Sequence, residues 1–232
     1  MLGYNTNEPL FSIDEFEVFP GEVITLTGES GIGKTTLLKT IAGLIKPISG
    51  TISISGKSEI FPKKIFSQNP LKSYFQPIRK RGFLGYIPQN LGLVRHATVM
   101  HNVMLGSNAG HKQFWTPIPL FQAKEAAMEA IELLGISEYK YQIIRKLSGG
   151  QKRRVATART LAQKPKLILA DEFLSELDDK TKDIVKNEVL SYISKNNASI
   201  IIVEHDIDRA REMSDRLFQI SDGKLVELEG GI

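Results

Sequence analysis

Short apolar runs alternate along the chain with stretches of helical periodicity. Residues 167–170 and 200–203 are apolar at every position, as in parallel strands that are buried on both faces. Residues 122–134 instead repeat their apolar side chains every three or four positions, which predicts an amphipathic helix. Strands that alternate with helices predict an α/β fold with a mainly parallel sheet and right-handed crossovers.

The first third of the chain contains shorter predicted strands. Residues 10–18 and 23–27 alternate in places, and Pro20-Gly21 between them predicts a turn. Residues 51–56 alternate cleanly and predict a half-buried strand. Residues 57–82 are rich in proline and basic residues, so we expect an irregular, exposed excursion there.

Three more helices are predicted from apolar spacing and end signals. Residues 36–42 precede a glycine, residues 148–163 precede a proline, and Asp178 or Asp179 can cap a third helix. Residues 90–160 are rich in helical signals and contain no clear strand. An inserted helical subdomain is therefore expected within them.

Composition sets the broad class of the protein. The chain has 232 residues, of which 41% are hydrophobic and 24% charged, within reach of one α/β domain with a subdomain. No apolar run approaches the roughly 20 residues that cross a bilayer, and no secretory signal is visible. The absence of cysteine excludes a disulfide scaffold and a thiolate metal site but leaves the compartment undecided. Because no signal is visible, a cytoplasmic location is the expectation. The net charge of +4 is scattered, and we expect no nucleic-acid partner.

A glycine-rich loop lies between the predicted strand at 23–27 and the helix at 36–42. It has the form G-x-x-x-x-G-K-[ST], in which backbone N–H groups cradle nucleotide phosphates. We expect Lys34 to reach the β- and γ-phosphates and Thr35 to place its hydroxyl on Mg²⁺. The loop residues expected to bind nucleotide are Gly28, Glu29, Ser30, Gly31, Ile32, Gly33, Lys34, Thr35 and Thr36.

Two acids stand at the end of the apolar run at 167–170. Asp171 closes the predicted strand and Glu172 follows it, so both are placed for a ligand at the edge of the sheet. In phosphate-loop NTPases such an aspartate holds Mg²⁺. Glu172 is then the natural group to orient and deprotonate the attacking water.

A second anion site is predicted where a helix begins at Ser148. Ser148 is a good N-cap, and Gly149 and Gly150 expose backbone N–H groups at the positive end of the helix. A capped helix without a ligand is the simpler interpretation of the same residues. We expect the following run, Lys152-Arg153-Arg154, to form a solvated basic face.

Leu147-Ser148-Gly149-Gly150-Gln151, together with the glycine loop, resembles the signature of the ATP-binding cassette (ABC) family. The resemblance covers nearly the whole chain. It implies a phosphate-loop NTPase core with a mainly parallel sheet, an N-terminal antiparallel β subdomain and an inserted α-helical subdomain. It further implies one nucleotide-binding domain over residues 1–232, in which 1–89 and 164–232 form the ATP-binding core and 90–163 the helical subdomain.

The resemblance also assigns roles to single residues. Gln89 matches the glutamine that links the Mg²⁺ site to the transport partner, and Asp178 closes the loop that crosses the dimer interface. His205 matches the histidine that senses the γ-phosphate. Tyr4 lies about where the family stacks an aromatic ring on adenine, and Phe11 competes for that role. Ser148, Gly149, Gly150 and Gln151 would contact the γ-phosphate held by the opposite subunit.

The implied function is ATP hydrolysis as the motor subunit of a membrane ABC transporter. ATP and Mg²⁺ would bind at the interface of a homodimer, or of a heterodimer with a second ABC ATPase. Separate membrane-spanning permease subunits would couple hydrolysis to transport, which places the chain on the cytoplasmic face of the inner membrane.

The amino-acid sequence of residues 123–177 is most similar to that of phosphonate-importer ATPases, although lipoprotein-release and macrolide-efflux ATPases share many of the same residues. A soluble ABC ATPase of iron–sulfur cluster assembly is the alternative. The transported substrate and the permease lie outside what this sequence encodes.

Overall fold

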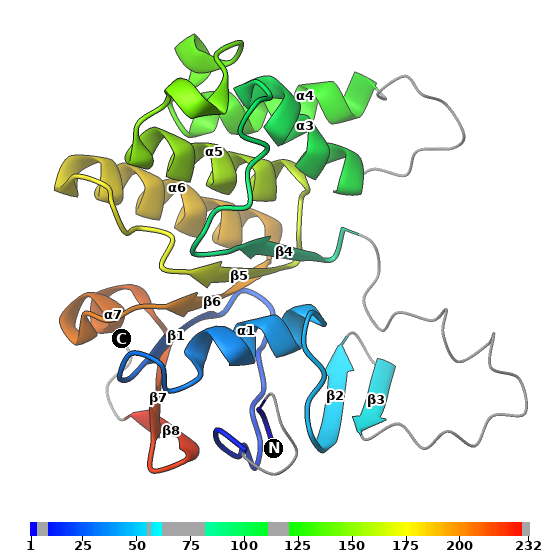
Figure 1. The fold of residues 1–232 in the computed structure, drawn as a ribbon, viewed down its shortest axis with the longest axis vertical. Helices are drawn as coiled ribbons and strands as arrows, with labels where there is room; N and C mark the ends of the chain where they lie inside the picture. The colour runs from blue at the N-terminus through cyan, green and yellow to red at the C-terminus, as the bar shows by residue number, and fades with distance from the viewer. Residues whose placement is uncertain (4–8, 55–56, 62–81, 111–120, 229–232) are drawn as a thin grey trace, which may run out of the picture. The chain divides into compact units, whose positions relative to one another are not determined.

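The computed structural model describes residues 1–3, 9–54, 57–61, 82–110 and 121–228. The chain divides into two compact units (Figure 1). One unit comprises Val18–Ile24 and Arg81–Val203. The other comprises Met1–Glu17, Thr25–Lys80 and Glu204–Ile232.

Parallel strands form the centre of the unit that contains Arg81–Val203. β4 (Leu84–Ile87), β5 (Leu167–Asp171) and β6 (Ser199–Val203) pair in that order, with Leu167 opposite both Leu84 and Ser199. Every residue of β5 and β6 is buried. The two apolar runs are therefore the buried parallel strands that the sequence predicts.

Helices make up the rest of this unit, together with two short 3₁₀ turns. They are α3 (Val99–Gly110), α4 (Phe121–Leu133), η1 (Ser137–Tyr139), η2 (Ile144–Lys146), α5 (Gly149–Ala162) and α6 (Asp179–Asn196). The predicted helices at 122–134 and 148–163 are confirmed to within about two residues at each end, which is the ordinary uncertainty of helix boundaries. Among the described residues of 90–160, the only strand-like contact is a single antiparallel bridge between Thr98 and Ile143.

Glycines allow α3 to approach α5 closely. A Cβ atom at Gly106 would collide with the backbone carbonyl of Arg159, and one at Gly110 would collide with that of Gln163. Backbone atoms of a packed helix cannot yield as a flexible side chain can. These two glycines therefore set the distance between the two helices.

Gly106→Ala is expected to lower the free energy of unfolding by about 3 kcal/mol, because overpacking against a rigid backbone forces the helices apart. Denaturant unfolding followed by circular dichroism measures the change. Leu105→Ala on the same helix is the control, since Leu105 is 44% exposed and its loss leaves the helix spacing intact. A Gly106→Ala protein as stable as the wild type would contradict the close-packing argument.

The second unit is built from β1 (Val23–Thr27), of which Thr25–Thr27 belong to it, and from several local elements. Its elements are α1 (Lys34–Ala42), β2 (Gly50–Ile54), β3 (Lys57–Phe61), α7 (Ile207–Met213), β7 (Arg216–Ser221) and β8 (Lys224–Leu228). Strand order here is β1-β7-β8, with β7 and β8 antiparallel. β2 and β3 form a separate antiparallel pair with Gly50 opposite Phe61.

Two predictions for the N-terminal third are wrong. Residues 10–18 form no strand and make only isolated bridges, from Phe11 to Leu2 and from Ser12 to Lys224. Their apolar side chains are used in tertiary packing instead, as where Phe16 meets the Phe218 ring edge-on at 5.1 Å between centroids.

Residues 57–61, which we expected to be irregular, form β3 because they pair with the strand directly before them. The rest of the expected excursion, residues 62–81, lies outside the described residues. The turn at Pro20-Gly21 is confirmed, and Gly21 has a φ of 86°.

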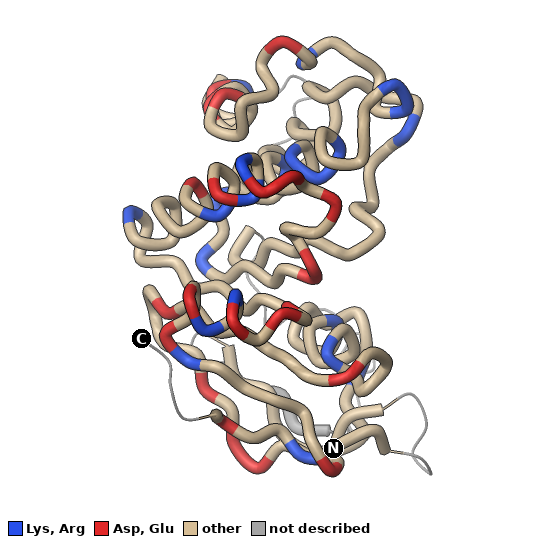
Figure 2. Tube along the Cα trace, turned by 90° about the vertical axis from the view of Figure 1, so that its left-hand side faces the viewer, with Lys and Arg blue, Asp and Glu red and all other residues tan. Residues whose placement is uncertain are grey.

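Basic and acidic residues are interspersed along the trace of each unit, in agreement with the scattered charge of the sequence (Figure 2). In the part of the chain that the structure describes, none of the helices combines the length and the apolar character needed to cross a membrane.

Candidate functional site

The glycine loop connects β1 to α1 through three left-handed glycines. Gly28, Gly31 and Gly33 have φ angles of 134°, 81° and 118°, a region that residues with a Cβ rarely adopt. Gly33 is the N-cap of α1 and offers no side chain at the helix end. The loop and the first turn of α1 together provide the backbone N–H groups and the positive helix end that bind anions.

Lys34 closes this loop with its own side chain. Its Nζ donates hydrogen bonds to the backbone carbonyls of Gly28 at 2.6 Å and Glu29 at 2.8 Å, and the residue is only 4% exposed. Thr35 is half-buried on the same first helical turn, and Thr36 is buried. The ammonium group is therefore held inside the loop, where a phosphate bound to the loop would meet a positive charge.

Phe11 supports the loop from behind. Phe11 is 3% exposed, and a Cβ at Gly33 would lie 2.7 Å from its ring. The Phe11 ring is therefore buried beneath the glycine loop and has no exposed face on which adenine could stack. Tyr4, the other aromatic residue considered for adenine, lies outside the described residues.

His205 follows the last strand residue of β6 and is exposed. Its backbone N–H donates to Oε1 of Glu204 at 2.9 Å, and the same carboxylate pairs with Arg209 at 3.4 Å. Asp206 caps α7 by accepting hydrogen bonds from the N–H groups of Asp208 and Arg209. The backbone of His205 is thus fixed while its imidazole remains open to solvent.

Asp171 and Glu172 lie at the carboxyl end of β5, in the unit that contains Arg81–Val203. Asp171 is 1% exposed, and Glu172 has a φ of 54°, which is uncommon for a residue other than glycine. The backbone N–H of Glu172 donates to the carbonyl of Val203 at 3.3 Å. Gln89 donates from Nε2 to the Oε2 atom of Glu172 at 3.1 Å. The structure therefore brings together Gln89 and Glu172, which are 83 positions apart in sequence.

The helix that begins after Ser148 has a complete capping box. The Ser148 hydroxyl accepts a hydrogen bond from the Gln151 N–H at 3.2 Å, and Gln151 Oε1 accepts one from the Ser148 N–H at 2.9 Å. The predicted N-cap is confirmed. Gly149 and Gly150 form the first turn without side chains that would cover the helix end.

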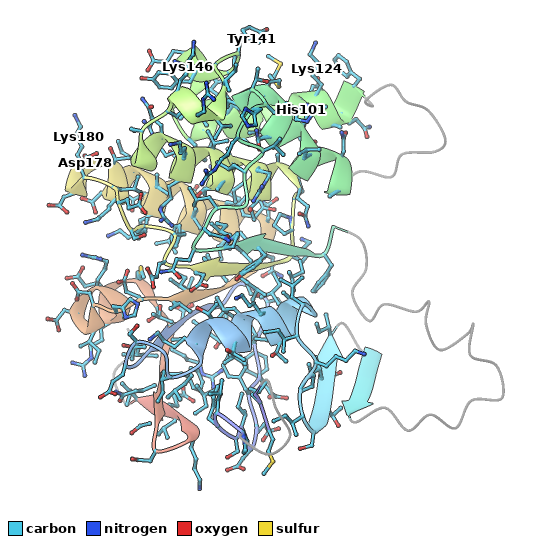
Figure 3. The ribbon with its side chains drawn as sticks, in the orientation of Figure 1. His101, Lys124, Tyr141, Lys146, Asp178 and Lys180 are labelled. Atoms are coloured by element: carbon cyan, nitrogen blue, oxygen red, sulfur yellow. The ribbon has the colours of Figure 1, made fainter. Side chains whose placement is uncertain are left out.

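Asp178 is the N-cap of α6, at the beginning of that helix in Figure 3. Its Oδ1 accepts a hydrogen bond from the Thr181 N–H at 3.0 Å. Hydrogen bonding from Thr181 lowers the pKa of the Asp178 carboxyl below its usual value. The sequence allowed either Asp178 or Asp179 as the N-cap of this helix, and in the structure the N-cap is Asp178.

Comparisons with known proteins identify the family. Residues 12–175 match the family model described as ABC transporter. The L-cystine transport system ATP-binding protein of Escherichia coli is 35% identical over 213 residues, which are 92% of this chain and 81% of the relative. The chain belongs to the ABC transporter family. A phosphonates import ATP-binding protein of Nostoc sp. is 34% identical to this ABC ATPase over 208 residues, 89% of this chain and 75% of the relative.

A solved structure supports the fold of the ABC ATPase. The dimeric post-hydrolysis state of the ATP-binding cassette MJ0796 bound to ADP and Pi matches with a TM-score of 0.75 at 26% identity. The match covers 93% of this chain and 89% of the other. The predicted phosphate-loop NTPase fold is confirmed, and the chain is an ATPase that binds and hydrolyses ATP.

Sequence reasoning missed two arginines of α5 in this ATPase. Arg159 donates to the backbone carbonyls of Leu91 at 2.8 Å and Gly92 at 2.7 Å, and so holds the turn that follows Gln89. Burial lowers the pKa of the Arg159 guanidinium below its usual value. Leu91 has a φ of 60°, an uncommon angle for a residue other than glycine, which those two bonds help to hold. The other arginine, Arg153, contacts Glu172. The helical position of both arginines is visible in the sequence, but three of their four acceptors are backbone carbonyls, which leave no pattern there.

Proposed function

We propose that this ABC ATPase is the motor subunit of a membrane importer, with phosphonate-type compounds as one candidate substrate class. The names of its relatives support an import role. They include ATP-binding proteins of systems for L-cystine, phosphonates, hypophosphite and Fe(3+) ions, at 33–35% identity. Relatives at similar identity serve different substrates, so this chain would couple ATP hydrolysis to transport while the permease selects the substrate.

In this proposal the ATP site is divided between two copies. Each copy would bind ATP on residues 28–36, with Lys34 neutralising phosphate charge. The capped N-terminus of α5 in the other copy would complete the site through Ser148, Gly149, Gly150 and Gln151. Asp178 would lie at the interface. The dimeric state of the cassette MJ0796, the match described above, supports this arrangement. A heterodimer with a second ABC ATPase would use the same surfaces.

Mg²⁺ suits the chemistry of the residues assigned to it. Thr35, Gln89 and Asp171 offer a hydroxyl, an amide oxygen and one buried carboxylate. Mg²⁺ prefers such hard oxygen ligands, and it is usually held by one or two carboxylates together with substrate phosphates. When bound, it would neutralise charge that develops on the phosphates.

Glu172 is the proposed general base. Its carboxylate would accept a proton from the attacking water as the oxygen of that water bonds to the γ-phosphorus, while the bond from the γ-phosphorus to the oxygen that leaves with ADP breaks. The hydrogen bond from Gln89 orients the carboxylate. His205 would steady the γ-phosphate. Within the single domain proposed over 1–232, residues 1–89 and 164–232 would form the ATP-binding core and 90–163 the helical subdomain.

Purification from the native membrane tests the importer proposal. We expect a tagged chain to be recovered in a complex with an integral membrane permease, which mass spectrometry identifies. The chain should bind this permease on the cytoplasmic face. ATP hydrolysis by that complex in lipid vesicles should drive uptake of its substrate. Recovery in a complex of soluble iron–sulfur scaffold proteins, or ATP-driven release of lipoprotein or drug, would overturn the proposal.

A further inference from the structure

Arg153 lies in the second turn of α5, and its side chain is only 1% exposed. The expectation of a solvated basic face over Lys152-Arg153-Arg154 is therefore wrong for its central residue. Lys152 and Arg154 are half-buried. Successive helical positions point in different directions, so three adjacent basic residues cannot share one solvated face.

The Arg153 guanidinium makes two hydrogen bonds to the segment after β5. One NH group donates to the backbone carbonyl of Glu172 at 2.8 Å, and another donates to Oε1 of Glu176 at 3.2 Å. A buried charge is strongly unfavourable unless it is paired and hydrogen-bonded. The rigid, planar fork of arginine also fixes the direction of both bonds. Arg153 therefore holds two points of this segment in one geometry.

Both of those points are strained. Glu172 has a φ of 54° and Glu176 a φ of 62°. Residues other than glycine keep such angles only where surrounding contacts impose them. Between these residues, Phe173 and Leu174 are each 2% exposed and anchor the segment in the core. Arg153 supplies the polar part of the same restraint.

Glu176 extends the restraint to the beginning of α5. A Cβ atom at Gly149 would lie 2.5 Å from Oε2 of Glu176, so the carboxylate lies directly against the first residue of the helix. A negative charge is favourable at a helix N-terminus. The carboxylate of Glu176 is thus placed between the guanidinium of Arg153 and the helix end that carries the signature residues.

We propose that Arg153 is a positioning residue for ATP hydrolysis, which fixes the backbone of Glu172 relative to the N-terminus of α5 and uses Glu176 as its anchor. This inference rests on the proposed role of Glu172 as the general base. When the N-terminus of α5 binds the phosphate held by the other copy, Arg153 couples the position of that helix end to Glu172 in its own copy. Hydrolysis in one site then depends on the occupancy of the other.

Steady-state kinetics of Arg153→Lys and Glu176→Gln tests the proposal. Arg153→Lys loses the planar fork that makes both hydrogen bonds, and Glu176→Gln loses the negative charge that pairs with the guanidinium. In each variant kcat is expected to fall about tenfold while KM and Kd for MgATP stay unchanged. The double variant should be no slower than Arg153→Lys alone, because the two residues act as one unit. Asp183→Asn is the matched control. It removes a carboxylate that is 69% exposed and 3.4 Å from Lys186, against 62% exposure for Glu176.

The exposed position of Glu176 keeps the test decisive even if Arg153→Lys folds poorly. Wild-type kcat in Glu176→Gln would overturn the proposal. So would a parallel loss of kcat, ATP affinity and thermal stability, which indicates a structural role alone. Glu172→Gln distinguishes a failure of the assigned base from a failure of the positioning role. If that variant still turns over, the assigned base is wrong; if it is inactive while the Arg153 and Glu176 variants have normal kcat, only the positioning role is wrong.

Discussion

Glu172→Gln is expected to slow ATP hydrolysis about a thousandfold while ATP still binds. Glutamine has the shape of glutamate but cannot accept a proton from water, and a positioned base contributes up to about 10⁴-fold to a rate. Its amide oxygen can still accept the hydrogen bond from Gln89, which spans 3.1 Å in the wild type. Phosphate release measures the rate, and binding of a fluorescent ATP analogue measures affinity.

The same variant tests the divided site. Because ATP persists in Glu172→Gln, the closed state should accumulate, and the protein should elute from a sizing column as a dimer with MgATP and as a monomer without it. Glu125→Gln removes an exposed acid from α4 and should behave as the wild type. A Glu172→Gln protein that stays monomeric with MgATP would contradict a site completed by a second copy.

Lys34→Ala is expected to weaken ATP binding about a hundredfold or more, equivalent to about 3 kcal/mol. The change removes the positive charge from the centre of the loop. It also removes the two hydrogen bonds, to the carbonyls of Gly28 and Glu29, that close the loop on itself. Isothermal titration calorimetry with MgATP measures the loss.

Lys39→Ala is the matched control for this change. Lys39 lies in the last turn of the same helix, at the end opposite the glycine loop. ATP affinity should therefore stay at the wild-type value in that variant. Circular dichroism checks that both proteins are folded, and unchanged ATPase activity in Lys34→Ala would refute the assignment of the phosphate loop.

Features that depend on local chemistry could be predicted from the sequence. The capping box at Ser148 and Gln151 joins residues three positions apart, and the strand at 199–203 is apolar at four consecutive positions. The glycine loop is recognisable because the spacing of its glycines, lysine and threonine is what forms the phosphate-binding loop. For the same reason the match to the ABC transporter family agrees with the resemblance seen in the motifs.

Strand pairing and burial, whether between neighbouring or distant segments, were not predictable in this way. The apolar alternation of residues 10–18 indicates a strand, yet their side chains pack without a ladder, and β3 forms where the sequence gives no strand pattern. β-Propensity depends on the partner strand more than on the segment itself. β4 shows the same limit, since its pairing partner is β5, about eighty residues further along the chain.

The sequence by itself determined the phosphate loop, the capped signature helix, the buried acidic strand end and the family, because each is encoded by neighbouring residues. Only the tertiary structure decided that Gln89 contacts Glu172 and that Arg153 is buried against Glu172 and Glu176. Those contacts join residues 19 to 83 positions apart. Three of the four groups that accept hydrogen bonds from Arg153 and Arg159 are main-chain carbonyls, which every residue carries. A group common to all residues leaves no trace in a sequence until the fold brings a specific donor to it.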